Sequence, residues 1–315
     1  MSLTKISRQA FDYRLKNKKF DHPDILKSIG AILKKNGGLF KMPEAEESVI
    51  LLLSGGLDSI VCWGYLMDKY KLKVYPLTNN NGASKRKYEK KSIKFFSRFY
   101  QQRYPKLFVP PIFLNVSFPT LKIEINEALN LFHPQAILDN FVAKPKIIPN
   151  LSLGTFSLSP ILAKIYSQHL LFVQNITIHT IFCGVIPHDG DGVPEQSYTS
   201  LLASTLYLRL TTADHHWQYS SPFYEKEIGH YFQKADLVRW AYLHQLPLEK
   251  TWSCHQSYRL HCGQCPTCFS RKEAFIKTKI PDKTSYQKPT NYTSPLYISI
   301  NKLKIKLLKI LKSFK

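Results

Sequence analysis

A continuous apolar run that ends in a glycine turn is the feature that most constrains the fold. Residues 49–53 read Val-Ile-Leu-Leu-Leu, and SGGLDS follows directly at 54–59. A run of this length and composition is typical of a strand buried on both faces, as in parallel sheets that are covered by helices. The sequence therefore predicts an α/β protein whose first core strand leads through a tight turn into a helix.

The rest of the chain alternates between strand-like and helix-like segments. We expect further strands at 73–78, 108–116, 176–184 and 219–223. We expect helices at 20–35, 59–70, 85–102, 160–172, 197–210 and 228–244. This alternation predicts a doubly wound parallel sheet with helices on both faces and with ligands at the carboxyl ends of its strands.

The turn after the first strand has the composition of a phosphate-binding loop. Gly55 and Gly56 let backbone amides approach phosphate oxygens, and the following helix offers unpaired amides with a favourable dipole. Ser54 and Ser59 add hydroxyl donors. Asp58 has two candidate roles, as a helix cap or as a neighbour of a bound magnesium ion. A plain strand-to-helix turn is the alternative, because Gly-Gly and Asp-x-Ser also form turns and caps.

Four of the six cysteines crowd into fifteen residues near the carboxyl terminus: Cys254, Cys262, Cys265 and Cys268. Such crowding suggests metal, and four thiolates suit a closed, structural zinc site. Gly263 permits the tight turn that such close ligands need. His255 and His261 are near enough to compete as ligands, and an iron–sulfur cluster is the chemical alternative.

The charge balance favours an anionic partner. The chain has 44 basic and 22 acidic side chains, a formal charge of +22. A nucleotide, a nucleic acid or an acidic protein surface would suit this charge. The alternative is that the organism's proteins are generally rich in lysine and that the charge only provides solubility. At 300–315, apolar residues at helical spacing and six lysines predict a basic amphipathic helix. It would dock on its own protein or a twin subunit, or bind an acidic membrane or nucleic acid.

No apolar run approaches the length of a membrane span, and residues 1–19 lack the apolar centre of a secretory signal. We therefore expect a cytoplasmic protein that does not act at a membrane. Disulfides are not expected in such a compartment.

SGGLDS matches the SGGxDS signature of the PP-loop ATP pyrophosphatases, which lacks the lysine of the Walker loop. The resemblance implies that ATP is cleaved between its α and β phosphates. A substrate oxygen would be adenylated, pyrophosphate would leave, and a nucleophile would then displace AMP.

Further residues resemble the QueC enzymes of this superfamily. Residues 234–254, KADLVRWAYLHQLPLEKTWSC, and 262–275, CGQCPTCFSRKEAF, look like the carboxyl-terminal part of QueC. The family's substrate loop resembles Gly184, Val185, Asp189 and the VPE of 193–195. The basic and acidic positions that follow the second strand in the family are matched more loosely, by Gly82, Lys85, Arg86 and Glu89. The resemblance spans about residues 48–278.

QueC enzymes convert 7-carboxy-7-deazaguanine into 7-cyano-7-deazaguanine with ammonia and two ATP, and the resemblance implies ATP, Mg²⁺ and Zn²⁺ as cofactors. Carried over by position, the ATP-binding residues would be Leu53, Ser54, Gly55, Gly56, Leu57, Asp58, Ser59, Ile60, Val61, Cys62 and Trp63. The four clustered cysteines would hold zinc. The candidates for the substrate pocket are Asp189, Glu195 and Lys234. The resemblance assigns no catalytic residue.

These assignments divide the chain into four parts. We expect a basic amino-terminal extension at 1–45, a PP-loop ATP-binding domain at 46–250, a zinc knuckle at 251–280, and a linker with the basic helix at 281–315.

The chain also departs from the family pattern. The family loop usually ends in Pro-Asp-Cys-Arg, whereas Pro194 is followed here by Glu-Gln-Ser, and a family Pro-x-Arg-Asn stretch is represented only by Pro149 and Asn150. A changed base or acceptor is therefore plausible, and the chain also resembles the QueC-like enzymes of anti-phage islands, the type IV CBASS and Qat systems. There a protein amine would capture the adenylate, which implies an acidic protein partner.

Three functions thus stay open: synthesis of a deazaguanine nitrile or amide, joining of the activated base to a protein, and an idle module that binds polyanions or partners. A homodimer is a further open possibility.

Overall fold

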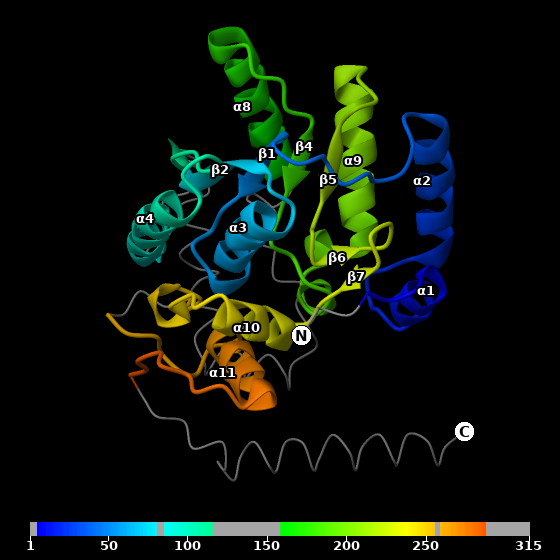
Figure 1. Ribbon diagram of the computed structural model, residues 1–315. Helices are drawn as coiled ribbons and strands as arrows, with labels where there is room; N and C mark the ends of the chain where they lie inside the picture. Colours follow the sequence, from blue (N-terminus) through cyan, green and yellow to red (C-terminus); the bar gives the residue numbers. More distant parts are fainter. Residues whose placement is uncertain (1–4, 81–84, 116–157, 256–258, 288–315) are drawn as a thin grey trace, which may run out of the picture.

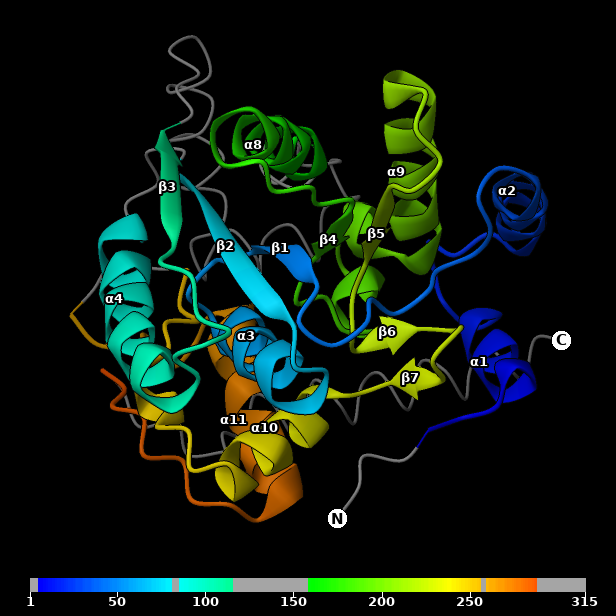
Figure 2. The ribbon, with the colours of Figure 1, turned by 45° about the horizontal axis from the view of Figure 1, so that its top comes forward.

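A five-stranded parallel sheet lies at the centre of the computed structural model, which describes residues 5–80, 85–115, 158–255 and 259–287. Its strands are β1 Ser48–Leu52, β2 Lys73–Asn80, β3 Ile112–Asn115, β4 Thr180–Phe182 and β5 Gln218–Ser220. Their order is β3-β2-β1-β4-β5, so the chain builds outward in both directions from β1 (Figure 1, Figure 2). This is the doubly wound parallel sheet that the sequence predicts.

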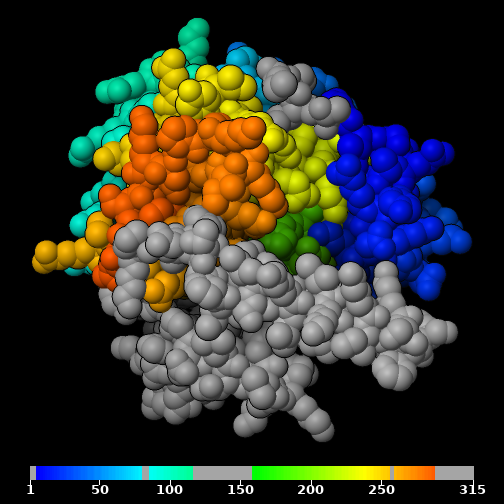
Figure 3. All heavy atoms as spheres, turned by 90° about the horizontal axis from the view of Figure 1, so that it is seen from below, coloured from blue at the N-terminus to red at the C-terminus, as the bar shows by residue number. Residues whose placement is uncertain are grey.

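Helices cover both faces of the sheet. They are α1 Arg8–Leu15, α2 Pro23–Lys35, α3 Leu57–Lys69, α4 Arg86–Arg103, α8 Ser159–Gln174, α9 Tyr198–Thr212, α10 Lys234–Leu243 and α11 Pro266–Thr278. One face packs against α3, α4 and α10, with α11 beyond α10; the other packs against α8 and α9, with α2 beside α9 (Figure 1, Figure 2). Seen from below, α10 and α11 form the surface next to the amino-terminal helices (Figure 3).

The central strand explains why both faces are apolar. Val49 and Leu51 point into the core shared with α3 and α4, whereas Ile50 lies in the core shared with α8 and α9. All three side chains are fully buried. Side chains of a strand alternate between the two faces, so a strand covered on both sides needs the unbroken apolar run that the sequence shows.

The amino-terminal segment is part of the core. Phe11 of α1 is fully buried and packs against the rings of Tyr198, Tyr224 and Tyr231. The buried Asp21 carboxylate accepts hydrogen bonds from the backbone amide and the hydroxyl of Thr199, at 2.8 and 3.0 Å. These contacts join the first residues of the chain to α9 and to the segment after β5.

One predicted helix is wrong at its beginning. We expected a helix over 228–244, but His230–Tyr231 form strand β7, which pairs antiparallel with β6 Tyr224–Glu225, and α10 begins only at Lys234. A capping box between Gln233 and Asp236 sets that start, because each side chain bonds the backbone of the other residue. The preceding Gly229 has a φ of 71°, which favours glycine and does not fit a helix.

Several sequence predictions lie outside the described residues. They are the basic helix at 300–315, Gly82, and the Pro149–Asn150 pair. Among the helices that the structure describes, none combines the length and the apolar character needed to cross a membrane.

Replacing Phe11 by alanine should lower the free energy of unfolding by about 3–5 kcal/mol, because it removes a buried ring from the aromatic cluster. The control is Tyr13→Ala on the same helix, whose side chain is 70% exposed and which should change stability by less than about 0.5 kcal/mol. Urea denaturation measures both. Equal stabilities of the two variants would show that α1 does not belong to the core.

Candidate active site and metal centre

The turn between β1 and α3 fits tightly between two other segments. Gly55 has a φ of 82°, and a Cβ there would lie 2.7 Å from the backbone oxygen of Glu89 on α4. The Gly55 carbonyl accepts hydrogen bonds from the Ser92 hydroxyl, at 2.8 Å, and from the backbone amide of Trp252, at 2.9 Å. Only glycine satisfies both the backbone angle and the space at this position.

Hydroxyl groups organise the rest of this turn. Ser59 Oγ lies 2.9 Å from Ser54 Oγ, accepts a hydrogen bond from the Ser54 amide and donates one to the Gly56 carbonyl. Gly56 caps α3 without a side chain, so no side-chain cap occupies the amides of the first turn. Gly184 lies directly against this turn, since a Cβ on it would be 2.9 Å from the Ser59 nitrogen. The free amides and the helix dipole make this end of α3 suited to an anion.

Three charged side chains meet beside the turn. Lys234, the first residue of α10, places its Nζ 3.2 Å from Asp58 Oδ2. Burial would lower the pKa of Lys234, but the carboxylates of Asp58 and Asp189 outweigh it and raise that pKa. Burial raises the pKa of Asp189 to about 6, and Asp58 adds to the rise while Lys234 opposes it. A charged ammonium thus lies within the site at neutral pH.

Asp189 and Lys234, predicted separately from the sequence, therefore lie in one cluster with Asp58 of the loop. Asp189 is held by the short helix η2 Asp189–Asp191, where its Oδ2 accepts a hydrogen bond from the Ile186 amide at 3.0 Å. The third candidate, Glu195, belongs to η3 Pro194–Gln196, which packs against η2. Its charge also acts on Tyr219 of β5, whose pKa is raised mainly by burial. The structure thus brings Asp189 and Lys234 to Asp58, and it places Glu195 on the segment next to Asp189.

A second ion cluster lies at the start of α4. Glu89 is buried, and its carboxylate lies 3.1 Å from Lys85 Nζ and 2.7 Å from Arg86 Nη1. Because the Glu89 backbone also touches Gly55, these two cations lie near the phosphate-loop candidate. They add positive charge at the start of α4, next to the loop.

Four buried cysteines converge on one point. Their sulfurs all lie within 4.8 Å of one another; Cys262 and Cys268 are 3.9 Å apart, and Cys254 and Cys265 are 4.0 Å apart. A tetrahedral ion with metal–sulfur bonds of about 2.3 Å separates its ligands by about 3.8 Å, so the four thiolates fit zinc. In an iron–sulfur cluster the four cysteines are divided among two or four irons, so they cannot all lie this close to one another.

Neither neighbouring histidine joins this group. His261 Nε2 accepts a hydrogen bond from the Ser253 amide at 3.2 Å, and its ring packs 4.4 Å from the Trp252 ring. His255 is exposed. Among the described residues, the four cysteines alone form a cluster of metal-binding side chains.

The cysteine cluster and the loop are physically connected. Trp252, two residues before Cys254, donates its backbone amide to Gly55 and stacks its ring on Tyr88 of α4 at 4.4 Å. Arg271 of α11 is fully buried and donates to the Leu248 carbonyl at 2.6 Å and to the Thr251 hydroxyl at 2.7 Å. The segment that carries the cysteine cluster is therefore the one that holds the loop.

Sequence reasoning missed Trp252 and Arg271 as individual residues. Both lie inside the strings that resemble QueC, but an arginine on a lysine-rich helix reads as a surface residue. Only the folded chain shows that Arg271 points inward toward the polar groups of 248–253.

Cys265→Ser should lose zinc and lower the free energy of unfolding, because a structural metal contributes directly to folding. Metal content measured after purification should fall from about one zinc per chain to well below it. Cys62→Ser is the control: Cys62 is equally buried but lies outside the cluster, so the variant should keep its zinc. Equal zinc content in both variants would contradict the assignment of Cys265 as a zinc ligand.

Asp189 should make stability depend on pH. Its folded pKa of about 6 lies above the value near 4 expected for the unfolded chain, so its contribution is present below about pH 4 and is lost as the pH rises through about 6. Asp189→Asn should therefore remove this fall in denaturation experiments across that range. Asp24→Asn, an exposed control, should leave the pH profile unchanged. Identical profiles for Asp189→Asn and the unchanged protein would contradict the assigned pKa.

Comparison with known proteins agrees with this geometry. Residues 161–279 match the family model of the queuosine biosynthesis protein QueC. The 7-cyano-7-deazaguanine synthase of Thermoplasma volcanium is 24% identical over 267 residues, covering 82% of this chain and 98% of the relative. The synthase of Paracoccus denitrificans is 48% identical over 54 residues, which cover 17% of this chain and 23% of that relative.

Among solved structures, the tRNA thiolase NcsA of Methanococcus maripaludis aligns with 87% of this chain and 78% of its own, at 14% identity and a TM-score of 0.33. The matched QueC region contains α8, β4, α9, β5, α10, the four cysteines and α11. The chain is therefore a homologue of the 7-cyano-7-deazaguanine synthases, and its residues 161–279 match the QueC family.

Proposed function

We propose that this chain is an ATP-dependent synthase that activates the carboxylate of 7-carboxy-7-deazaguanine and converts it to the amide and then the nitrile, with release of AMP and pyrophosphate. The observation that carries the proposal is the open amino terminus of α3, with Lys234 paired to Asp58 in its first turn and with Lys85 and Arg86 at the start of the neighbouring α4. The named activity of the relatives supplies the substrate class.

The loop suits the phosphates of ATP. Backbone amides in the first turn of α3 have no side-chain cap, and Gly184 lets the segment after β4 pack closely against this turn. Ser54 and Ser59 are bonded to each other, so their hydroxyls and the loop are already ordered before a nucleotide arrives. Such preorganised donors stabilise charge without a further reorganisation cost during the reaction.

The charged cluster suits the site of phosphoryl chemistry. Lys234 would neutralise charge that develops on the phosphates, and its pairing with Asp58 fixes its position. The Asp58 Oδ1 atom is buried and has no hydrogen-bond partner among the described residues, which leaves an acceptor that fits a Mg²⁺ ligand or a bound water. Asp58 and Asp189 would hold Mg²⁺, which supplies charge neutralisation for phosphate transfer when bound.

The proposed reaction has two ATP-dependent stages. A substrate carboxylate oxygen attacks the α-phosphorus of ATP, pyrophosphate leaves, and a mixed anhydride with AMP forms. Ammonia then attacks the acyl carbon and AMP leaves, which gives the amide. The amide oxygen attacks a second ATP in the same way, and loss of AMP and a proton from the adenylated amide gives the nitrile.

Zinc has a structural part in this proposal. The four cysteines leave no open ligand position, so a bound ion would not contact substrate. Its effect on activity would pass through Trp252, whose amide holds the Gly55 carbonyl.

Asp58→Asn and Ser59→Ala should each lower the rate of AMP release by about 100-fold or more, because each removes a group next to the reacting phosphates. The assay supplies 7-carboxy-7-deazaguanine, ATP, Mg²⁺ and ammonia, and separates AMP and the product base by chromatography. Asp68→Asn is the matched control, since Asp68 lies at the other end of α3 and pairs with His244 and Tyr104. It should keep most of the activity.

The acceptor is the part of the proposal that this assay can overturn. AMP and nitrile formed with ammonia support synthesis of the free base. AMP formed without nitrile or amide, together with a mass increase on a partner protein, would indicate capture by a protein amine. No AMP under any condition would contradict the enzymatic proposal altogether.

A further inference from the structure

The outward face of α4 carries a row of cations. Lys87, Lys91, Lys94 and Arg98 follow one another at steps of four, three and four residues, which places them along one face of the helix, and all four are exposed. None of them pairs with a carboxylate of a described residue. The single acidic residue of α4, Glu89, is buried on the inner side. We call these four residues the basic stripe.

Unpaired cations at this spacing repel one another, which costs stability on an isolated helix surface. The core-facing side of α4 compensates, because Ile93, Phe96 and Tyr100 are fully buried. The helix is therefore held in place by its inner side, while its outer side keeps charges that pair with no carboxylate in the part of the chain that the structure describes. A partner with several negative charges in a row would remove this repulsion.

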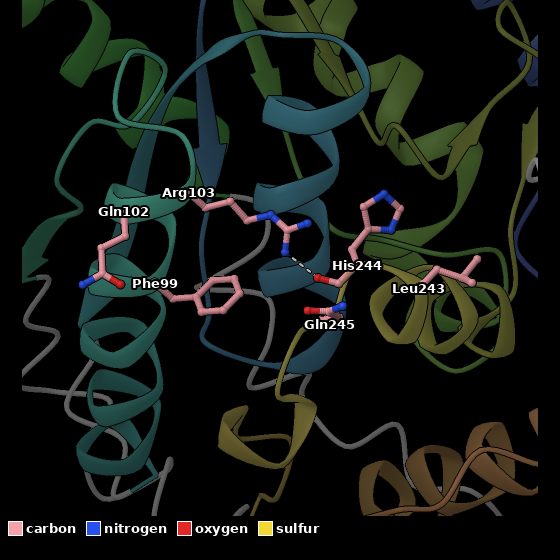
Figure 4. A pocket seen from close by; sticks show the side chains of 6 residues that line it. All are labelled: Phe99, Gln102, Arg103, Leu243, His244 and Gln245. Carbon is pink, nitrogen blue, oxygen red and sulfur yellow. Dashed lines mark hydrogen bonds between the residues drawn. The ribbon is translucent and has the colours of Figure 1, made fainter.

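A pocket of about 390 Å³ lies where the basic stripe ends. It is lined by Phe99, Gln102, Arg103, Leu243, His244 and Gln245 (Figure 4). Phe99 and Arg103 point from the last turns of α4 toward the end of α10 (Figure 4). Gln102 follows Arg98 by four residues and so lies on the same helix face as the stripe. Arg103 donates a hydrogen bond to the His244 carbonyl, which fixes its guanidinium at the rim.

We propose that the basic stripe and this pocket bind a single-stranded polynucleotide, with phosphates along the stripe and a base in the pocket. Lysine and arginine along the stripe neutralise consecutive phosphates without reading sequence. The Phe99 ring and the Arg103 guanidinium offer surfaces on which a base stacks, and the amides of Gln102 and Gln245 offer donors and acceptors to its edges. An acidic protein segment would pair with the cations of the stripe, but it would not need the Phe99 ring or the side-chain amides of Gln102 and Gln245.

This surface is separate from the proposed ATP site. The loop contacts the beginning of α4, through Glu89 and Ser92, whereas the pocket lies at its carboxyl end. The two cations at the start of α4, Lys85 and Arg86, are paired with Glu89. Binding of a strand therefore does not require ATP turnover, and either site can be tested without the other.

The test measures binding of a fluorescently labelled oligouridylate to the full chain at several salt concentrations. The variant replaces Lys87, Lys91, Lys94 and Arg98 by glutamine, which keeps the helix propensity and removes the charges. Affinity at about 50 mM salt should fall about tenfold or more, and the slope of log affinity against log salt should become shallower by roughly 2 to 3, from about 0.7 per lost phosphate contact.

The control removes the same charge elsewhere: Lys27, Lys34, Lys35 and Lys41, exposed on and just after α2, are replaced by glutamine. It should bind RNA nearly as well as the unchanged protein. Equal losses in both variants would show that only net charge matters and would overturn the proposal.

Two further measurements decide the occupant. The double variant Phe99→Leu, Gln102→Ala should bind oligouridylate more weakly but bind polyphosphate as the unchanged protein does. An equal loss of affinity for both ligands would show that no base binds in the pocket. Polyglutamate or anionic vesicles that displace the RNA at equal charge concentration would show that the surface takes acidic protein or lipid instead, and would overturn the assignment to nucleic acid.

Discussion

The carbonyl group of Gly55 is the contact on which the rest of the site depends. It joins three segments that are far apart in the sequence: the turn after β1, the Ser92 hydroxyl of α4 and the Trp252 amide ahead of the cysteine cluster. Because Gly55 has a left-handed backbone angle and no side chain, both donors reach the same oxygen without a clash. The loop is thus held from outside as well as by its own serines, which leaves the amides of α3 for a ligand.

The fold could be predicted where a local pattern has one structural meaning. The apolar run at 49–53 and the following glycines predicted β1 and α3 within two residues at each end, and the crowding of the four cysteines predicted that their sulfurs converge. The hairpin at 224–231 could not be predicted, because its two-residue strands depend on pairing with each other and on Gly229. Helix α1 was not predicted, because its apolar side consists only of Phe11 and Leu15.

In the candidate site, too, single residues could be predicted from the sequence but their contacts with one another could not. Asp189 and Lys234 stand 45 positions apart in the chain, yet α10 and η2 bring them to one carboxylate, Asp58. Resemblance to a family singled out all three, but no spacing in the sequence indicates that their charges interact. Glu195 was singled out on the same grounds; it belongs to η3, which packs against η2, and its charge acts on Tyr219. Contacts made through tertiary structure are what a linear pattern leaves undetermined.

The position of the amino-terminal helices has a consequence for how the chain acquires its structure during synthesis. Asp21 bonds Thr199, a partner 178 residues later, and Phe11 packs against rings as distant as Tyr231. A ribosome delivers the first helices well before these partners exist, so α1 and α2 emerge without the surface that they later cover. Contacts of such long separation close late and slowly. The opening segment of the chain would therefore be among the last to settle, and until then its apolar residues would be exposed to chaperones.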